Sequence, residues 1–542
     1  MNVADEAHDV VVVGAGFAGL YALKRLRDSG LDVLGIERGS GVGGTWYWNR
    51  YPGARCDIES AYYSYSFSES LQADWEWTEK YATQPEILSY LEHVAERFDL
   101  NRHIRFREEV VGAEYDEGAA TWRVATDLGR HLSCRYLVFA TGCLSVPKIP
   151  DIPGLNDFAG PVLHTHAWPS EPPRLEGMRV GLVGTGSSGI QAAPILAETA
   201  GELTIFQRTA NFSVPAHNAP LEPRAWAQTK ADYPQLRERS RWSASGSVPL
   251  DIVPVPALSV TEAERLARYE ERWRVGGMKF LQVFTDIYTD HAANDTAADF
   301  VRAKIAEIVH DPQVAKTLMP NDHPIGTKRI CTDTDYYGMF NRPNVSLVDV
   351  RAEPIVRVSD EGLITETRTY PLDVLVLATG FDAMTGALLK PEIRGRDGRS
   401  LRDHWSAGPR SYLGIAISGF PNLFTITGPG SPAVISNMVT SIEQHVEWIA
   451  DHIDYLESHD IVASEAEPHA EEEWVAHVRE LAEATLYGEA ASWYVGANIP
   501  GKPRVFMPYV GGVGEYRARC DAVRADGYRG FKLATRTTDV LV

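Results

Sequence analysis

The chain has 542 residues, a length that predicts about three to four domains of ordinary size. Asp and Glu number 73 against 52 Lys and Arg, and the net charge of −21 disfavours nucleic acid and anionic membranes as partners. The first residues are acidic, unlike a secretory signal, and no apolar run approaches the roughly 18 residues that cross a bilayer. We expect a cytoplasmic protein without nucleic-acid or membrane partners, and we take it as a monomer.

The cysteines never form a Cys-x-x-Cys pair. They are Cys56, Cys134, Cys143, Cys331 and Cys520. This spacing argues against a disulfide framework, a zinc ribbon and a flavin disulfide reductase, each of which needs paired sulfurs. His and carboxylate residues form no metal-ligand pattern either, so we predict no metal site.

The first dinucleotide site is predicted near the N-terminus. Residues 9–13 form an apolar run typical of a buried parallel strand, and Gly14-Ala-Gly16-Phe-Ala-Gly19 follows at once. The first glycine permits a tight turn, the second lets the backbone approach a pyrophosphate, and the third packs a helix on the strand. A second strand at 32–36 ends before Glu37, whose carboxylate accepts ribose hydroxyls and repels a 2′-phosphate. FAD fits this site.

Residues 43–57 are dense in glycine, aromatic and charged side chains, unlike a strand or an amphipathic helix. So many large side chains are costly to leave exposed, so we expect this segment to wrap a planar cofactor. Gly44, Thr45 and Trp46, near its start, are predicted to contact FAD.

A second dinucleotide site repeats the pattern. A strand at 179–183 leads into Gly184-Thr185-Gly186-Ser187-Ser188-Gly189, and another strand follows at 203–207. This second strand is followed by Arg208 and Thr209 where the first site has an acid. A guanidinium and a hydroxyl suit a 2′-phosphate, which favours NADPH over NADH.

Two further strands, at 136–139 and 374–377, each run into Ala-Thr-Gly, at residues 140–142 and 378–380. We expect the chain to cross between domains at these points. The second dinucleotide domain is then inserted into the first, and the C-terminal third of the chain returns to complete the first.

A small helical insert is predicted inside the second domain. A stretch rich in Pro and Ser at 211–256 breaks the α/β rhythm, and Thr261 with Glu264 forms a capping box before Leu266, Tyr269 and Trp273 at helical spacing. A long amphipathic helix near the C-terminus carries Ile442, Val446, Ile449, Ile453 and Leu456.

The predicted fold is therefore α/β, with two nested Rossmann-like dinucleotide-binding domains and a small helical insert. The predicted FAD-binding domain comprises residues 1–145 and, with the C-terminal region, 381–542. The predicted NADPH-binding domain comprises 146–210 and 330–380, and the insert comprises 211–329.

Between the two fingerprints lies Phe158-x-Gly160-x-x-x-His164-x-x-x-Trp168. This segment, the Gly-Gly-x-Trp loop, Gly326-Thr-Lys328-Arg329 and Ser492-Trp493-Tyr-Val-Gly-Ala-Asn resemble Baeyer-Villiger monooxygenases of the class B flavoprotein family, above all phenylacetone and steroid monooxygenases. The resemblance covers almost the whole chain, in order. It implies NADPH- and O₂-dependent oxidation of ketones to esters or lactones through a C4a-peroxyflavin, with sulfoxidation as a side activity.

The resemblance also implies roles for single residues. Arg329 is expected to stabilise the peroxide and the reacting carbonyl, and Asp57 is expected to orient Arg329. Lys328 is expected to join Arg208 at the NADPH phosphate, and Trp493 to contact the nicotinamide end.

The resemblance implies that His164 and Trp168 transmit domain movement and carry no protons. The predicted FAD contacts are Gly14, Gly16, Gly19, Glu37, Gly44, Thr45, Trp46, Asp57, Tyr63 and Met438. The predicted NADPH contacts are Gly184, Thr185, Gly186, Ser187, Ser188, Gly189, Arg208, Thr209, Lys328, Arg329 and Trp493.

Three alternative functions stay open. A flavin-containing N- or S-monooxygenase shares both nucleotide sites, although Trp168 and Arg329 disfavour it. A pyridine-nucleotide reductase needs a dithiol, quinone or second redox centre, and the cysteine spacing offers no dithiol. A non-enzymatic nucleotide-binding or interaction protein would not need Asp57 and Arg329 together.

Within the favoured function, the loop at 428–437 resembles that of phenylacetone-like members and predicts a roomy pocket for aryl-alkyl or bulky cyclic ketones.

Overall fold

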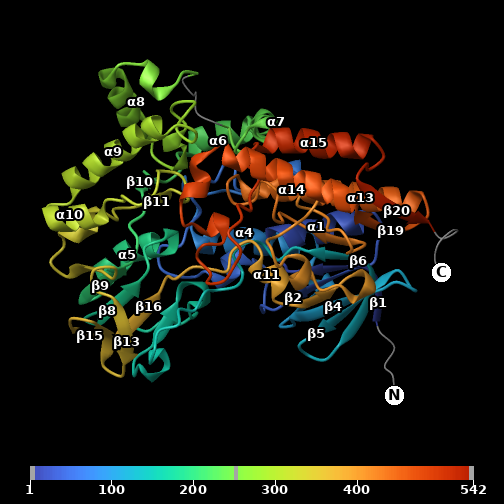
Figure 1. The fold of residues 1–542 in the computed structure, drawn as a ribbon, viewed down its shortest axis with the longest axis horizontal. Coiled ribbons are helices and arrows are strands. Elements are labelled where there is room, and N and C mark those ends of the chain that lie inside the picture. The colour runs from blue at the N-terminus through green and yellow to red at the C-terminus, as the bar shows by residue number, and fades with distance from the viewer. Residues whose placement is uncertain (1–5, 249–253, 536–542) are drawn as a thin grey trace.

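The computed structural model describes residues 6–248 and 254–535, and it contains two largely parallel sheets flanked by helices (Figure 1). Residues 1–5, which begin the acidic N-terminal segment, lie outside the described residues. The first sheet has the order β17-β4-β5-β6-β1-β2-β3, with β18 beside β6. Its strands are β1 (Glu6–Val13), β2 (Val33–Glu37), β3 (Ile104–Phe106), β4 (Val110–Asp116), β5 (Thr121–Thr126), β6 (His131–Phe139), β17 (Glu392–Arg394) and β18 (Leu423–Thr425).

The unit built on this sheet, called here the first unit, begins with the predicted strand, turn and helix. The apolar end of β1 is buried and pairs in parallel with β2 and β6. Gly14 has a φ of 104°, and a Cβ on it would lie 2.7 Å from the Ala140 carbonyl oxygen, so the turn accepts only glycine. The first helices are α1 (Phe17–Asp28), α2 (Thr45–Trp48), α3 (Glu69–Asp74) and α4 (Gln84–Arg97).

The second sheet has the order β12-β9-β8-β16-β7, and its unit is called here the second unit. Its strands lie between residues 162 and 377, within the stretch of chain that separates β6 from β17, which confirms the nested arrangement. The predicted strands at 179–183 and 374–377 are β8 and β16. The strands and following helix are β7 (Val162–His164), β8 (Arg179–Val183), β9 (Glu202–Gln207), β12 (Val345–Asp349), β16 (Val374–Leu377) and α5 (Ser187–Thr199). A small antiparallel sheet adds β13 (Ile355–Ser359), β14 (Gly362–Thr365) and β15 (Thr369–Pro371).

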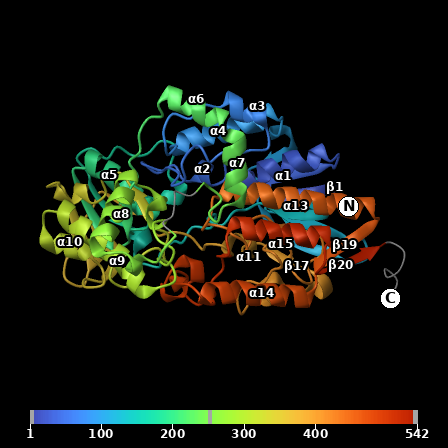
Figure 2. The ribbon, with the colours of Figure 1, turned by 90° about the horizontal axis from the view of Figure 1, so that it is seen from above.

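Helices occupy much of the region 211–329, but they do not form one body (Figure 2). The region contains α6 (Pro223–Ala231), α7 (Tyr233–Trp242), α8 (Glu262–Val275), α9 (His291–Ile308) and α10 (Pro312–Leu318). Trp226 and Tyr233, from α6 and α7, join the core of the first unit, whereas Tyr269, from α8, joins the core of the second. Where the region begins and ends, β10 (Ser213–Pro215) pairs in parallel with β11 (Cys331–Asp333).

The predicted capping box begins α8, with the Thr261 and Glu264 side chains each accepting the other's backbone N–H. Tyr269 of this helix is fully buried. Leu266, in contrast, is 45% exposed, so the helical spacing of the apolar residues does not make them all core.

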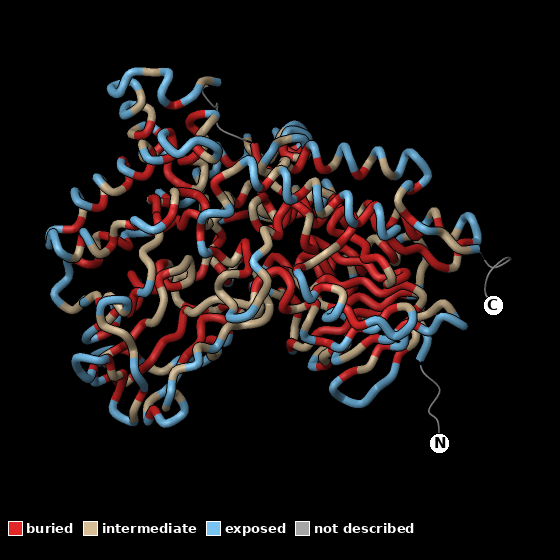
Figure 3. Tube along the Cα trace, in the orientation of Figure 1, coloured by how far each residue is buried: buried red, intermediate tan, exposed pale blue. Residues whose placement is uncertain are grey.

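The C-terminal third returns to the first unit, as predicted: β17 and β18 complete its sheet, and α13 (Met438–Ser458) packs on α1 (Figure 2). All five apolar residues predicted to form the stripe of this helix are buried. Figure 3 shows the buried chain concentrated in the strands of the first sheet and the elements beside them. The remaining elements are α11 (Gly386–Leu389), α12 (Leu401–His404), α14 (Pro468–Glu483), α15 (Val513–Ala525), β19 (Ile461–Ala466) and β20 (Phe531–Thr535). None of the described helices is long and apolar enough to cross a membrane.

Candidate active site

A cavity of about 930 Å³ lies where the two units meet, and both glycine turns line it. Its volume lies in the range of ligand and cofactor sites. Every predicted cofactor contact lines this cavity except Gly19 and Gly189. A Cβ on Gly19 would lie 1.8 Å from the Gly14 oxygen, and one on Gly189 would lie 2.2 Å from the Gly184 oxygen. These third glycines therefore let α1 and α5 pack against their turns and do not face the cavity.

On the first unit, Glu37 ends β2 inside the cavity and is 6% exposed. Its Oε2 accepts the Ala15 backbone N–H at 2.9 Å and its Oε1 accepts that of Gly39 at 2.7 Å. Burial raises the pKa of the Glu37 carboxyl, while these two N–H groups oppose the rise. Each oxygen keeps a lone pair for a further donor, so the site fits the paired hydroxyls of an FAD ribose.

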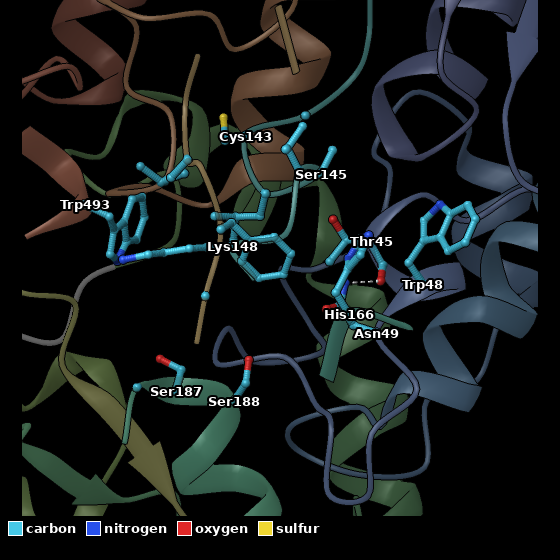
Figure 4. A pocket seen from close by; sticks show the side chains of 18 of the residues that line it. Thr45, Trp48, Asn49, Cys143, Ser145, Lys148, His166, Ser187, Ser188 and Trp493 are labelled. Carbon is cyan, nitrogen blue, oxygen red and sulfur yellow. Dashed lines mark hydrogen bonds between the residues drawn. The ribbon is translucent and has the colours of Figure 1, made fainter. Parts of the chain in front are cut away.

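The aromatic segment also borders the cavity on this side. The Trp46 indole N–H donates to the Tyr63 hydroxyl at 3.1 Å, which joins two of the predicted FAD contacts. Met438, at the start of α13, lines the same cavity from the C-terminal third of the chain. Figure 4 shows Thr45, Trp48 and Asn49 of this segment together on one side of the cavity, apart from Trp493.

On the second unit, the start of α5 presents Ser187 and Ser188 to the cavity (Figure 4). A Cβ on Gly186 would meet nothing within 4 Å, so the turn leaves open space in front of the helix N-terminus. Backbone N–H groups at a helix N-terminus attract phosphate, so this opening fits the pyrophosphate of a second dinucleotide.

Three cations converge beside this turn. Arg208, Lys328 and Arg351 all line the cavity. Arg351 donates to the Thr209 hydroxyl at 2.9 Å and to Asp322 at 2.6 Å. Burial lowers the pKa of Lys328. The positive charges of Arg208 and Arg351 lower this pKa further, and the negative charge of Asp322 raises it.

Sequence reasoning missed Arg351 and Asp322 at this site. Arg351 lies here because β12 is next to β9, so residues that follow the two strands meet at one edge of the sheet. Asp322 lies between α10 and β11, and no local pattern places it here.

Arg329 and Asp57, separated by 272 positions in sequence, form a bidentate ion pair in the cavity. Arg329 Nε donates to Oδ2 at 2.6 Å and Nη2 donates to Oδ1 at 2.8 Å, while Nη1 donates to the Val434 carbonyl. The exposed fractions of the two side chains are 18% and 20%. Burial opposes the charge of Arg329, but the attraction and hydrogen bonds of Asp57 hold its pKa above the ordinary value.

The four fingerprint residues do not line the cavity. Phe158, His164 and Trp168 are buried, and a Cβ on Gly160 would lie 2.2 Å from the Asp373 carbonyl oxygen. His164 Nδ1 accepts the backbone N–H of His166 at 3.0 Å. The fingerprint thus shapes the chain between the units, and among its residues it is His166, at a variable position of the pattern, that reaches the cavity.

The loop at 428–437, from which we predict a roomy pocket, is itself mostly buried. Only Val434 and Ser436 of this loop line the cavity. No described group of His, Cys, Asp and Glu residues is placed to hold a metal ion, and all five cysteines are buried and free.

A family model described as pyridine nucleotide-disulphide oxidoreductase matches residues 8–232. A Baeyer-Villiger monooxygenase of Pseudooceanicola batsensis is 43% identical over 524 residues, which cover 96% of this chain and 95% of that protein. A phenazine N-monooxygenase of Lysobacter antibioticus is 43% identical over 537 residues, 98% of each chain. A solved structure, oxidized steroid monooxygenase bound to NADP, matches with a TM-score of 0.94 at 53% identity, covering 97% of this chain and 99% of that one. Because relatives this similar span nearly its whole length, the chain belongs to the Baeyer-Villiger monooxygenase family.

Proposed function

We propose that this chain catalyses the NADPH- and O₂-dependent Baeyer-Villiger oxidation of ketones to esters or lactones. The observation that carries the proposal is the ion pair of Arg329 with Asp57, in one cavity with both dinucleotide turns. When bound, FAD and NADPH supply the electrons and the activated oxygen. Two electrons come from NADPH, one atom of O₂ enters the ester, and the other leaves as water.

Arg329 is the proposed electrostatic catalyst. A guanidinium has five N–H donors: three are used by Asp57 and Val434, and the buried Tyr494 hydroxyl also hydrogen-bonds with this side chain, so at least one remains for a reacting oxygen. Because Asp57 accepts hydrogen bonds from two nitrogens of the Arg329 guanidinium, the guanidinium cannot rotate away from the cavity. A fixed positive donor in a site with little water stabilises the tetrahedral oxyanion that forms when oxygen adds to the ketone carbonyl.

The cations of the second unit are proposed to hold the NADPH 2′-phosphate. Arg208 and Lys328 supply positive charge, and Arg351 is fixed beside them by its bonds to Thr209 and Asp322. A nucleotide held by these residues would help to exclude water from the reacting atoms. Trp493, across the cavity from Thr45 and Trp48 in Figure 4, is proposed to contact its nicotinamide end.

The proposed substrates are aryl-alkyl and bulky cyclic ketones, with small aliphatic ketones poorer and sulfoxidation a side activity. A similar protein of known structure is named for steroids, which supports a cavity for bulky substrates. Val434 and Ser436, the cavity-lining residues of loop 428–437, are proposed to border the ketone.

Oxidation of nitrogen is the second candidate, because a relative of equal identity is named a phenazine N-monooxygenase. Purified protein given NADPH, O₂ and a broad panel of ketones, sulfides and amines decides between them. We expect esters or lactones from bulky ketones. If sulfides or amines were oxygenated and no ketone gave an ester, the N- or S-monooxygenase function would replace ours.

We retain the domain boundaries at 145, 210, 329 and 380 as a proposal. Action as a cytoplasmic monomer likewise stays a prediction from the sequence.

A further inference from the structure

His166 occupies a position that the fingerprint leaves variable. It lies in the short 3-10 helix Thr165–Ala167, between the fingerprint residues His164 and Trp168. Its side chain is buried, with 4% exposed, and lines the cofactor cavity. Figure 4 shows it on the same side of the cavity as Thr45, Trp48 and Asn49. The fingerprint pattern does not require an aromatic ring at position 166, so the contacts of the His166 ring need a separate explanation.

The imidazole makes contacts on three sides. It stacks on Trp48 with ring centroids 5.8 Å apart and an interplanar angle of 22°, and it meets Phe381 edge-on at 5.3 Å. Its Nε2 lies 3.1 Å from Nη2 of Arg38, and the same Nη2 donates to the Ser145 carbonyl at 3.0 Å. The Arg38 guanidinium also lies 4.5 Å over the Trp48 ring, a cation–π distance. The contacts of His166 with Arg38 and with Trp48 therefore support each other, because Arg38 and Trp48 also contact each other.

These contacts join parts of the molecule that belong to different units. Arg38 follows β2 and Trp48 ends α2, both in the first unit. His166 follows β7, which pairs with β16 in the second unit. Ser145 and Phe381 lie on the two segments by which the chain crosses between the units. The side chain of His166 thus connects the second unit with the first unit and with the crossing that carries Phe381, and Arg38 extends this connection to the other crossing at Ser145.

The hydrogen bond fixes the charge state of the ring. A guanidinium only donates, so Nε2 of His166 is an acceptor and the imidazole is neutral with its proton on Nδ1. Burial, Arg38 and His164 together lower the pKa of His166 to about 4, which agrees with a neutral ring at pH 7. No described residue accepts a hydrogen bond from Nδ1 of His166. The ring is therefore held by its contacts with Arg38, Trp48 and Phe381.

We propose that Arg38, Trp48 and His166 form an interdomain clasp that holds the second unit in the position where oxygen transfer is coupled to NADPH oxidation. His166 is then a positioning residue, and the inference rests on the proposed function. Without the clasp, reduced enzyme spends more time with its units misaligned and open to water. NADPH, O₂ and a proton are then converted into NADP⁺ and H₂O₂, and the ketone is left unchanged.

The test compares His166→Ala, Arg38→Met and the double variant in the FAD-loaded enzyme with a bulky ketone. Ester formed and H₂O₂ released are measured per NADPH consumed. We expect the ratio of H₂O₂ to ester to rise about tenfold in each single variant, the effect of losing one hydrogen bond to a charged group. The double variant should lose clearly less than the sum of the two single losses, because both single variants remove the hydrogen bond between Arg38 and His166. The control His131→Ala, at an exposed position of β6, should keep the wild-type ratio.

A conservative variant separates positioning from simple packing. His166→Gln keeps an acceptor for Arg38 but loses the ring, so it should recover a part of the coupling that His166→Ala loses. It also keeps the test valid if the alanine variant fails to fold. A wild-type ratio in His166→Ala and Arg38→Met, or losses that add in the double variant, would overturn the clasp.

The dissociation constant of NADP⁺, measured by calorimetry, distinguishes failure of the clasp from failure of the proposed function. We expect it to rise about three- to tenfold in each single variant, because less of the protein is in the closed arrangement. If the wild type makes no ester from any ketone but these affinities shift without adding, the function is wrong and the clasp stands. If the wild type makes ester and neither readout changes, the clasp is wrong and the function stands.

Discussion

Replacement of Arg329 by alanine tests the proposed mechanism most directly. The change removes the guanidinium that donates to both oxygens of Asp57 and that is proposed to donate to the reacting oxygen. Loss of one donor to a developing oxyanion typically costs about 2.7–4 kcal/mol, so ester formation should fall by about 100- to 1,000-fold. Reduction of the flavin by NADPH should persist, since hydride transfer depends on positioning rather than on an oxyanion site.

The same change has a cost in stability that the structure bounds. Breaking a fully buried ion pair costs about 3–5 kcal/mol, because one charge is left without a partner. The exposed fraction of Asp57 is 20%, and water that reaches it reduces this cost. Arg329→Ala should therefore give a folded, yellow protein with a lower unfolding temperature. Arg329→Lys should restore activity only in part, since an ammonium lacks the planar fork.

Stopped-flow absorbance would follow flavin reduction, and gas chromatography would follow the ester. Arg55→Ala is a matched control, because Arg55 lines the same cavity and pairs with Glu79 at 3.1 Å, with no proposed part in the chemistry. It should lower ester formation by less than about threefold, within the ordinary effect of a partly exposed pair. Near-normal ester yield per NADPH in Arg329→Ala would refute the catalytic role.

Three further expectations follow from the cofactor sites and the core. The wild type should prefer NADPH, and Arg208→Ala should reduce the preference by about ten- to a hundredfold in kcat/KM; equal use of both nucleotides by the wild type would contradict the assignment. Glu37→Gln should weaken rebinding of FAD to the apoprotein about tenfold, as measured by flavin fluorescence, and unchanged affinity would exclude the ribose contact. Burial lowers the pKa of His445 and of His452 from 6.5 to about 3, so the unfolded chain takes up protons that the folded chain refuses. The stability that these two histidines contribute to the folded chain is full above pH 6.5 and is lost toward pH 3, at up to about 1.4 kcal/mol per pH unit for each histidine. Urea unfolding should therefore show lower stability at pH 5.5 than at pH 7.5, and the reverse order would exclude this cause.

The sequence predicts those parts of the fold whose signals are local. The strands β8 and β16 are apolar runs bounded by turns, so their limits could be given to the residue. The apolar stripe of α13 runs from Ile442 to Leu456 within a helix of 21 residues and identifies its buried face. The pairing of β10 with β11 was not foreseen, because each strand has three residues and they are joined only through tertiary structure. The division of the helical insert between two cores depends on the same long-range contacts.

Prediction of the candidate site from the sequence has the same limit: residues that only long-range contacts bring together cannot be identified from local patterns. The glycine turns carry their own signature, whereas adjacent cations such as Lys328 and Arg329 usually belong to a solvated surface, so only the family resemblance singled them out. Arg351 and His166 have no local signature. Each reaches the cavity because a strand order or a domain contact brings it there.

The way the chain crosses between units explains why contacts at this junction matter for the chemistry. Each crossing follows an Ala-Thr-Gly turn at the carboxyl end of a parallel strand, β6 or β16, so the cavity forms where the carboxyl edges of both sheets face each other. The two crossings also bind each other: Lys148 donates its backbone N–H to Gly380, and Asp382 donates to Val146. Two paired segments can act as a hinge, but they do not by themselves fix the angle between the units. In the proposed mechanism that angle decides whether Arg329 faces both nucleotides at once, so we expect side chains that reach across the junction to determine how much of the NADPH consumed ends in product.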